Sequence, residues 1–379
     1  MLCQYFAAEQ CRSCQLLAMP YEQQLAKKQQ QLSQLLSLPQ DGLLLPPVAS
    51  AEFHFRNKAK MVVMGSVTKP VLGIINHQQQ EIDLTGCPLY PSAFQDAFVP
   101  IVEFIQRAHL TPYDVTTKKG ELKFILLTRS EATGLWMLRF VLRSQNCVAA
   151  IRKHLSSLQA QLPSLSVCSV NLQPEHKAVL EGEIEILLSD ESMLAEQLND
   201  VPLYIQPQGF FQTNPALAAK LYQAARDWTN HLPLVHIWDL FCGVGGFALH
   251  LAAPGRVITG IEISASAIEC ASRSAVELGF EHLQFQALDA AAFAKAQQQR
   301  PDLLVVNPPR RGLGAELCAT VSQLQPRWLL YSSCHPQSLQ SDLALLSQYR
   351  VRKVQLFDFF PHTAHAEVLC LLQLFDPAA

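Results

Sequence analysis

Long apolar runs are missing from this sequence of 379 residues. Hydrophobic residues make up 49% of the chain, yet charged or polar side chains interrupt every stretch. None approaches the roughly 20 residues that a membrane-spanning helix needs. The first residues, Met-Leu-Cys-Gln-Tyr-Phe, also lack the basic and apolar segments of a secretory signal. We therefore expect a soluble, cytoplasmic protein without a membrane partner.

An overall positive charge is missing too, because the formal net charge is −3. This argues against a nucleic-acid-binding surface that covers the whole protein, and no DNA partner is expected. Residues 53–153 differ from the rest, with 13 Lys and Arg against 7 Asp and Glu. Within them, basic and aromatic side chains alternate from Phe53 to Lys60, a combination that can hold phosphates and stack bases. An exposed strand with solvated charges is the alternative interpretation.

Eleven cysteines are present, and disulfides are not expected in a cytoplasmic chain. Three of them follow the pattern Cys-x7-Cys-x2-Cys, and a distant fourth precedes a proline: Cys3, Cys11, Cys14 and Cys87. Such a set is typical of iron–sulfur ligation, although zinc also accepts four thiolates. The Cys-x3-Cys-x2-Cys spacing of radical enzymes is absent, so we favour a structural [4Fe–4S] cluster.

The first half of the chain predicts one helix and then several strands. Leucines at near-helical spacing indicate a helix from Tyr21 to Leu38 that stops at Pro39. Apolar runs then predict strands at residues 61–64, 71–75, 122–128 and 135–142. We expect an N-terminal α+β domain over residues 1–205, which carries the cluster and contacts RNA.

The composition changes near residue 205, and strands alternate with helices from there on. Asn214 and Pro215 are expected to cap the first of these helices, which leads into residues 216–228. Alternating strands and helices indicate a doubly wound, mostly parallel sheet over residues 206–379. The fold class is therefore α/β, with a Rossmann-like domain in the second half.

A glycine-rich turn follows the first strand of this second domain. The segment Asp239-Leu-Phe-Cys-Gly-Val-Gly245 brings Gly243 and Gly245 to the start of a helix, where backbone amides can approach a ligand. The next strand ends at Glu262, whose carboxylate can accept hydrogen bonds from both hydroxyls of a ribose. These features alone do not exclude NAD. Two prolines after Asn307 fix the end of a later strand and aim that amide at the pocket.

Cys334 lies at the end of another apolar strand, in Leu330-Tyr-Ser-Ser-Cys-His-Pro336. Ligands of open α/β sheets bind at this edge, so Cys334 is a candidate nucleophile. Glu367 directly precedes the apolar run 368–374, and this position aims its carboxylate at the same edge.

In their order along the chain, these motifs resemble the S-adenosylmethionine-dependent RNA (uracil-C5)-methyltransferases. The resemblance rests on Asp239-x-Phe-Cys-Gly-x-Gly, Glu262, Asn307-Pro-Pro-Arg310, Ser333-Cys334 and the segment 357–367, and the four N-terminal cysteines match the [4Fe–4S] members. The chain is most similar to shorter bacterial members that modify 23S rRNA. We expect it to lack the small N-terminal RNA-binding barrel of longer relatives.

The resemblance implies a class I methyltransferase domain with a seven-stranded sheet, on which the helix near residues 21–38 can pack. It implies S-adenosylmethionine as cofactor, bound by Gln212, Phe241, Glu262 and Asn307. Two departures stand out: Asn307 replaces a frequent Asp, and Gly246 stands where some relatives have Asn.

The chemistry assigns the remaining roles, because uracil C5 is too weak a nucleophile to accept a methyl group unaided. Cys334 adds to C6, and Glu367 later removes the C5 proton. Arg310 and His335 are candidates to stabilise the thiolate, and His362, Thr363 and His365 are candidates to orient Glu367. The target uridine must be unpaired or flipped out.

Three functions stay open in this interpretation. The leading one is methylation of a uridine in 23S rRNA by a monomeric enzyme. Methylation of a tRNA T-loop uridine is weakened by the cluster cysteines. A non-catalytic RNA-binding assembly protein is weakened by the presence of both Cys334 and Glu367.

Overall fold

The computed structural model describes residues 3–38, 42–176, 181–280 and 282–375, and the chain divides into two compact units. Unit 1 comprises Met1–Cys14, Glu52–Glu196 and Gln206–Gln208, and unit 2 comprises Gln15–Ala51, Gln197–Ile205 and Gly209–Ala379. This division differs from a single boundary after residue 205. Two segments from the first half, Gln15–Ala51 and Gln197–Ile205, belong to unit 2.

Unit 1 is built on a sheet with the strand order β3-β2-β1-β4-β5-β6-β7. Its neighbouring strands are antiparallel except for β5 and β6, which are parallel and are joined through helix α4. The elements are α1 (Gln4–Ala7), β1 (Lys58–Ser66), β2 (Lys69–Ile75), β3 (Glu81–Asp83), α3 (Ser92–Arg107), β4 (Leu122–Arg129), β5 (Trp136–Leu142), α4 (Val148–Gln161), β6 (Leu165–Leu172) and β7 (Ile184–Leu187). A short 3-10 helix, Gln145–Cys147, precedes α4.

The core of unit 1 lies between this sheet and its two long helices. Phe94 and Phe104 of α3 are buried, and the rings of Phe94 and Trp136 meet edge to face with centroids 4.8 Å apart. Such aromatic pairs add stability beyond the area that they bury. The sheet and the two helices therefore form a unit with its own core.

Unit 2 contains a sheet with the strand order β12-β11-β10-β13-β14-β16-β15. Five neighbouring strands run parallel, and β16 is antiparallel to both of its neighbours. The strands are β10 (His236–Leu240), β11 (Val257–Glu262), β12 (Leu283–Ala287), β13 (Leu303–Val306), β14 (Trp328–Ser333), β15 (Tyr349–Phe357) and β16 (Glu367–Leu374). The central strands are apolar on both faces because helices cover both sides of a parallel sheet.

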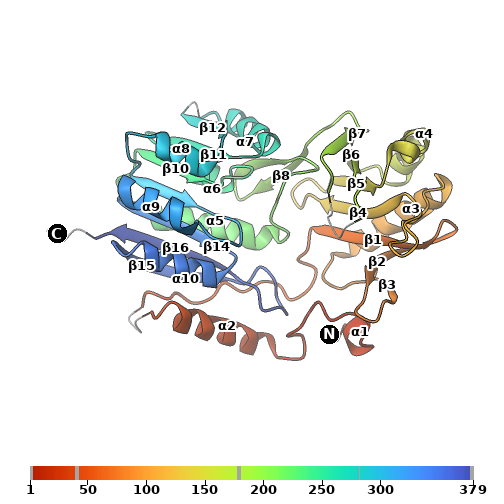
Figure 1. Ribbon diagram of the computed structural model, residues 1–379, viewed down its shortest axis with the longest axis horizontal. Helices are drawn as coiled ribbons and strands as arrows, with labels where there is room; N and C mark the ends of the chain where they lie inside the picture. The colour runs from red at the N-terminus through yellow and green to blue at the C-terminus, as the bar shows by residue number, and fades with distance from the viewer. Residues whose placement is uncertain (1–2, 39–41, 177–180, 281, 376–379) are drawn as a thin grey trace. The chain divides into compact units, whose positions relative to one another are not determined.

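The helices of unit 2 form two rows of neighbours. One row comprises α8 (Ala290–Ala296), α9 (Gly314–Leu324), α10 (Pro336–Leu345) and, beside α10, α2 (Tyr21–Leu35), as Figure 1 shows. The other comprises α5 (Pro215–Thr229), α6 (Gly246–His250) and α7 (Ala265–Leu278). A hairpin of β8 (Leu194–Leu198) and β9 (Val201–Ile205) precedes α5.

Two predicted helices can be compared with the structure. Asn214 caps α5, since its Oδ1 accepts a hydrogen bond from the Leu217 N–H and Pro215 occupies the first turn, which confirms that prediction. Helix α2 ends at Leu35 rather than at Leu38. Leu32 is 2% exposed and belongs to the core of unit 2, which explains why the segment around α2 groups with that unit. Among the described residues, no helix combines the length and apolarity that crossing a membrane requires.

Candidate active site

One edge of the unit 2 sheet collects the predicted site residues. Strands β10, β11, β13 and β14 run in the same direction, so their carboxyl ends meet at this edge. Because β16 runs the opposite way, it brings its first residue to the same place. Segments far apart in sequence therefore deliver Phe241, Glu262, Asn307, Cys334 and Glu367 to one edge.

The register of β14 and β16 makes Cys334 and Glu367 neighbours. Ser333 pairs with Val368, so the residue that follows Ser333 lies beside the residue that precedes Val368. The Cys334 side chain is half-buried, whereas Glu367 is only 4% exposed. A thiol that a ligand can reach and a shielded carboxyl group thus stand next to each other.

Ser332 holds the Glu367 carboxylate. Its buried hydroxyl donates a hydrogen bond of 2.5 Å to Glu367 Oε1. Burial raises the pKa of Glu367 to about 7, and the hydrogen bond from Ser332 opposes that rise. A carboxyl group with a pKa near neutrality can accept and release a proton at physiological pH. The sequence alone gives Ser332 no role, because it lies within an apolar strand.

The electrostatics around Cys334 differ from the expected positive field. Burial raises the pKa of the thiol, and the nearby charge of Glu367 raises it further. The Arg310 guanidinium acts in the expected direction and lowers it. His335 has a structural part in this turn, because it caps α10 by accepting a hydrogen bond from the Ser338 N–H. Burial and Glu367 therefore favour the neutral thiol, and Arg310 is the group that favours its ionisation.

The glycine-rich turn has the geometry of a cofactor cradle. Phe241 and Gly243 adopt left-handed backbone angles, with φ of 65° and 54°. A Cβ atom at Gly243 would meet nothing within 4 Å, so the space beside this turn is open. Glu262 Oε2 accepts a hydrogen bond from the Gly243 N–H at 3.3 Å, so the carboxylate lies against the glycine-rich turn. The arrangement fits an adenosyl ligand whose ribose hydroxyls bind Glu262.

A buried acid supports the same turn. Asp239 Oδ2 accepts a hydrogen bond of 3.0 Å from the Ala248 N–H, and its burial raises the pKa to about 8. Among the described residues, its Oδ1 is a buried atom without a hydrogen-bond partner. Asp239 therefore ties the glycine-rich turn to α6.

The two departures from the family pattern have different surroundings. A Cβ atom at Gly246 would lie 2.4 Å from the Tyr222 hydroxyl, so the tyrosine fills the space that a larger residue would need. Asn307 is half-buried at the end of β13, and its backbone N–H donates to the Leu240 carbonyl oxygen at 3.4 Å. Gln212 is half-buried in the segment before α5. Tyr222 is a buried residue that packs against this helix and that sequence reasoning did not single out.

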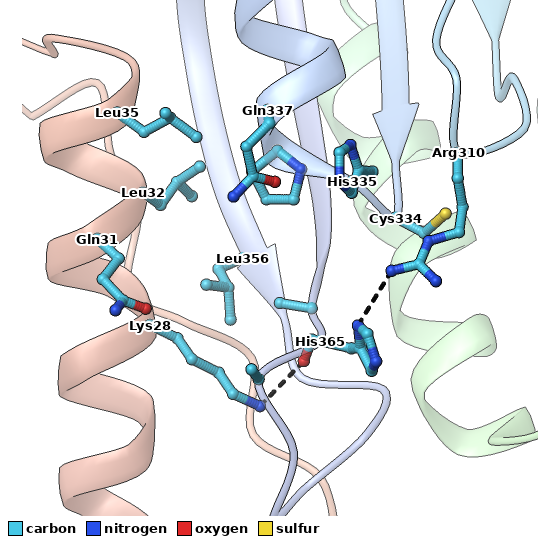
Figure 2. A pocket seen from close by; sticks show the side chains of 13 residues that line it. Lys28, Gln31, Leu32, Leu35, Arg310, Cys334, His335, Gln337, Leu356 and His365 are labelled. Atoms are coloured by element: carbon cyan, nitrogen blue, oxygen red, sulfur yellow. Dashed lines mark hydrogen bonds between the residues drawn. The ribbon is translucent and has the colours of Figure 1, made fainter.

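A cavity of about 530 Å³ opens beside Cys334. Figure 2 shows Lys28 and Gln31 on α2 at one side, and Cys334, Arg310 and His365 at the other. Arg310 lies 3.4 Å from the His365 ring, and the lining residues that the structure describes include no Asp or Glu. Pockets of roughly 300 to 1,000 Å³ typically bind small ligands, and the cationic lining suits a phosphate-bearing one.

The four N-terminal cysteines all lie in unit 1 and are half-buried. Burial raises the pKa of Cys14 to about 12, and the charges of Cys87, Cys11 and Cys3 raise it further. Burial raises the pKa of Cys87 to about 11, and the charges of Cys3 and Cys11 also raise it. In the described part of the chain, no three His, Cys, Asp or Glu side chains converge as one metal ion requires. A [4Fe–4S] cluster instead binds each thiolate through a different iron, and its positive irons would relieve the mutual repulsion.

The basic and aromatic segment of unit 1 is only partly accessible. Phe55 and Asn57 are buried, and the Arg56 guanidinium lies 6.0 Å from the centroid of the Tyr90 ring. Strand β1 begins at Lys58, so the segment is a loop that enters a strand rather than an exposed strand. Lys60 is exposed. Phe55 is therefore not available on the surface beside Lys60.

The sheet, the glycine-rich turn and the acid at the end of β11 define an α/β methyltransferase of class I, which uses S-adenosylmethionine. Comparisons with known proteins identify the family. The family model described as tRNA (Uracil-5-)-methyltransferase matches residues 185–374. The chain therefore belongs to the RNA (uracil-C5)-methyltransferase family.

Individual relatives match over nearly the whole chain. The 23S rRNA (uracil(747)-C(5))-methyltransferase RlmC of Pectobacterium atrosepticum is 54% identical over 98% of this chain and 100% of its own length. The enzyme of the same name from Escherichia coli O139:H28 is 54% identical over 98% of this chain and 99% of its own length. The crystal structure of Pyrococcus abyssi tRNA (uracil-54, C5)-methyltransferase with S-adenosyl-L-homocysteine superposes with a TM-score of 0.80 at 25% identity, covering 96% of this chain and 84% of that one.

Proposed function

We propose that this protein transfers a methyl group from S-adenosylmethionine to C5 of a uridine in 23S rRNA, at the position equivalent to uracil 747 that names its relatives. The observation that carries this proposal is the placement of Cys334 beside Glu367 at the edge that also holds the glycine-rich turn. The similarity over the full length of both chains supports the choice of RNA.

Cys334 acts as the nucleophile. Its thiolate sulfur bonds to C6 of uracil, and the electron pair of the C5–C6 double bond moves onto C5 as an enolate. S-adenosylmethionine supplies a methyl group that its sulfonium makes electrophilic. C5 accepts this methyl group, the methyl–sulfur bond breaks, and S-adenosylhomocysteine leaves. Arg310 assists by favouring the thiolate.

Glu367 acts as the base that completes the reaction. Its carboxylate accepts the proton from C5, and the electron pair of that C–H bond re-forms the C5–C6 double bond. The bond between C6 and sulfur then breaks and returns its electron pair to Cys334. Since the pKa of Glu367 is about 7, the carboxylate is available near neutral pH, and Ser332 keeps it oriented.

Gln212, Phe241, Glu262 and Asn307 bind the methyl donor in this proposal. Among them, Glu262 contacts the glycine-rich turn directly, because its carboxylate accepts a hydrogen bond from the Gly243 N–H. Its contact would be with the ribose hydroxyls. The cationic cavity beside Cys334 binds the backbone of the flipped uridine and its neighbours.

Cys3, Cys11, Cys14 and Cys87 bind a [4Fe–4S] cluster in unit 1. The support is their mutual proximity and burial, which disfavour four uncompensated thiolates. The cluster supplies a structural cross-link between the N-terminal segment and the residues around Cys87. The surface of unit 1 contacts RNA through exposed basic residues such as Lys60. The enzyme acts as a monomer in the cytoplasm.

A second candidate function has one specific observation in its favour. The structural match is to an enzyme named for uracil 54 of tRNA, and the family model has a tRNA description. The two candidates separate in a methylation assay with matched transcripts. We expect methylation of a 23S rRNA segment that contains the target uridine, and none when cytidine replaces it. Methylation of tRNA alone would establish the second candidate.

Glu367→Gln tests the assigned roles. Glutamine keeps the size of the side chain but cannot accept the C5 proton, so the reaction should stop after methyl transfer. We expect a methylated RNA covalently attached to the protein, visible as a slower band on a denaturing gel. The adduct should be absent from Glu367→Gln/Cys334→Ala. A Glu367→Gln protein that turns over without an adduct contradicts the role of Glu367.

A further inference from the structure

Helix α2 makes a set of contacts that the proposed reaction does not use. Lys28 Nζ donates a hydrogen bond of 2.6 Å to Asp358 Oδ1, and others of 3.0 Å to the His365 carbonyl oxygen and 3.4 Å to that of Phe360. All three acceptors lie within residues 358–366, the loop that joins β15 to β16. One side chain therefore holds both ends of that loop.

Gln24 lies one turn earlier on α2 and holds the middle of the same loop. Its Oε1 accepts a hydrogen bond of 2.9 Å from the His362 N–H, and the His362 carbonyl oxygen accepts one of 2.8 Å from the Leu16 N–H. His362 has a left-handed φ of 66°, a conformation that residues other than glycine rarely adopt. Such a conformation persists only where surrounding contacts fix it, and these contacts are available for that purpose.

The loop ends at Glu367, the first residue of β16. The position of the proposed base therefore depends on how residues 358–366 enter the strand. From the other side, Ser332 holds Glu367 through one hydrogen bond. The loop and the strand partner together leave the carboxylate little freedom.

The ion pair between Lys28 and Asp358 is buried, with side-chain exposures of 4% and 0%. Lysine is almost never buried to this degree unless it is paired. Well-packed apolar residues often stabilise a fold as much as a buried ion pair does, so stability alone is a weak reason for this one. Three directed hydrogen bonds from one ammonium group fix the positions of three loop atoms, which an apolar side chain cannot do.

Lys28 also lines the cavity that opens beside Cys334 (Figure 2). The figure shows its ammonium group reaching the backbone next to His365, whose ring faces Arg310. The same side chain thus connects α2, the loop and the wall of the cavity.

We propose that Lys28 is a positioning residue for the final proton abstraction: from α2 it fixes the loop 358–366 so that Glu367 meets the C5 proton of the methylated adduct. This inference rests on the proposed role of Glu367. The proton abstraction should be the step most sensitive to Lys28, because it alone needs the carboxylate at a defined place. Addition of Cys334 and methyl transfer do not require the loop in this way.

Lys28→Met tests the proposal, with Lys27→Met as the matched control. Lys27 is the adjacent residue of α2 and is exposed. We expect kcat of Lys28→Met to fall about 100-fold, the loss that a misplacement of roughly 1 Å can cause. KM for RNA should change little, because the Lys28 ammonium group is engaged with Asp358 and the loop carbonyl oxygens and leaves phosphate binding to Arg310. The methylated covalent adduct should accumulate during turnover. Lys27→Met should match the parent protein in kcat and show no adduct.

A second variant separates positioning from folding. Lys28→Met alone leaves the buried Asp358 carboxylate without its cation, which can lower the melting temperature. Lys28→Met/Asp358→Asn removes both charges, so it should regain thermal stability while the hydrogen bonds to the Phe360 and His365 carbonyl oxygens stay lost. The adduct should still accumulate. If the double variant regains kcat together with stability, Lys28 is only structural and the proposal is wrong.

Glu367→Gln in the same assay separates the proposed role of Lys28 from the proposed role of Glu367. If it accumulates the adduct and stably folded Lys28→Met does not, the role of Lys28 fails and the role of Glu367 stands. If Glu367→Gln forms no adduct, the assignment of the base fails first.

Discussion

Two groups of thiols in this protein show how surroundings give cysteine different uses. In unit 2, Cys334 is a single half-buried thiol with a cation, Arg310, and an acid, Glu367, as neighbours. In unit 1, Cys14 has three other cysteines as neighbours, and their charges raise its pKa beyond the effect of burial. The first thiol can ionise for one step of a reaction. In the second set, the raised pKa values favour neutral thiols, and the proposed cluster would supply the positive charge that four thiolates require.

Cys334→Ala should have the largest effect in this comparison. Without the thiol, C5 is never activated, so we expect methyl transfer to fall about 10⁴-fold or more. The measurement is incorporation of labelled methyl into the target RNA. Iron content should not change, because the proposed cluster uses other cysteines. Cys147→Ala is a suitable control, since Cys147 is half-buried in unit 1 and lies outside both groups. A Cys334→Ala protein that still methylates RNA contradicts the comparison.

Cys14→Ser tests the group of four cysteines in unit 1. We expect protein purified without oxygen to contain iron and sulfide, and the variant to lose nearly all of both, with a lower melting temperature for unit 1. Iron analysis and visible absorption check this result. Cys147→Ser should keep its iron. An iron-free parent protein, or a Cys14→Ser variant with full iron content, would show that the four thiols serve another purpose.

Ser332→Ala should give the smallest effect and acts on the acid beside Cys334. Activity requires the ionised carboxylate, so the rate should fall as the pH drops through about 7, where Glu367 takes up a proton. Loss of the Ser332 hydrogen bond removes a contact that favours the ionised form. The acidic limb of the pH–rate profile should therefore move to higher pH, by about one unit. An unchanged profile means that Ser332 does not tune Glu367.

Local sequence patterns predicted where several candidate residues lie in the fold. Cys334 directly follows an apolar strand, Glu262 ends one, and Asn214 precedes a proline at a helix start. Other elements were missed, one of them a strand of only three residues, Glu81–Asp83. Strand β3, strand β6 and helix α3 were not identified, although the residues of α3 fill much of the core of unit 1.

The sequence by itself determined the chemical groups, the order of strands and helices in the second half, and the family, because these depend on residue types at short spacing. Tertiary structure decided which distant groups meet. Lys28 contacts Asp358 across 330 positions, and Ser332 meets Glu367 through the antiparallel register of β14 and β16. Such pairings follow from the packing of whole elements, such as α2 against the core of unit 2. The residues around each partner in the sequence do not reveal which distant residue it will contact.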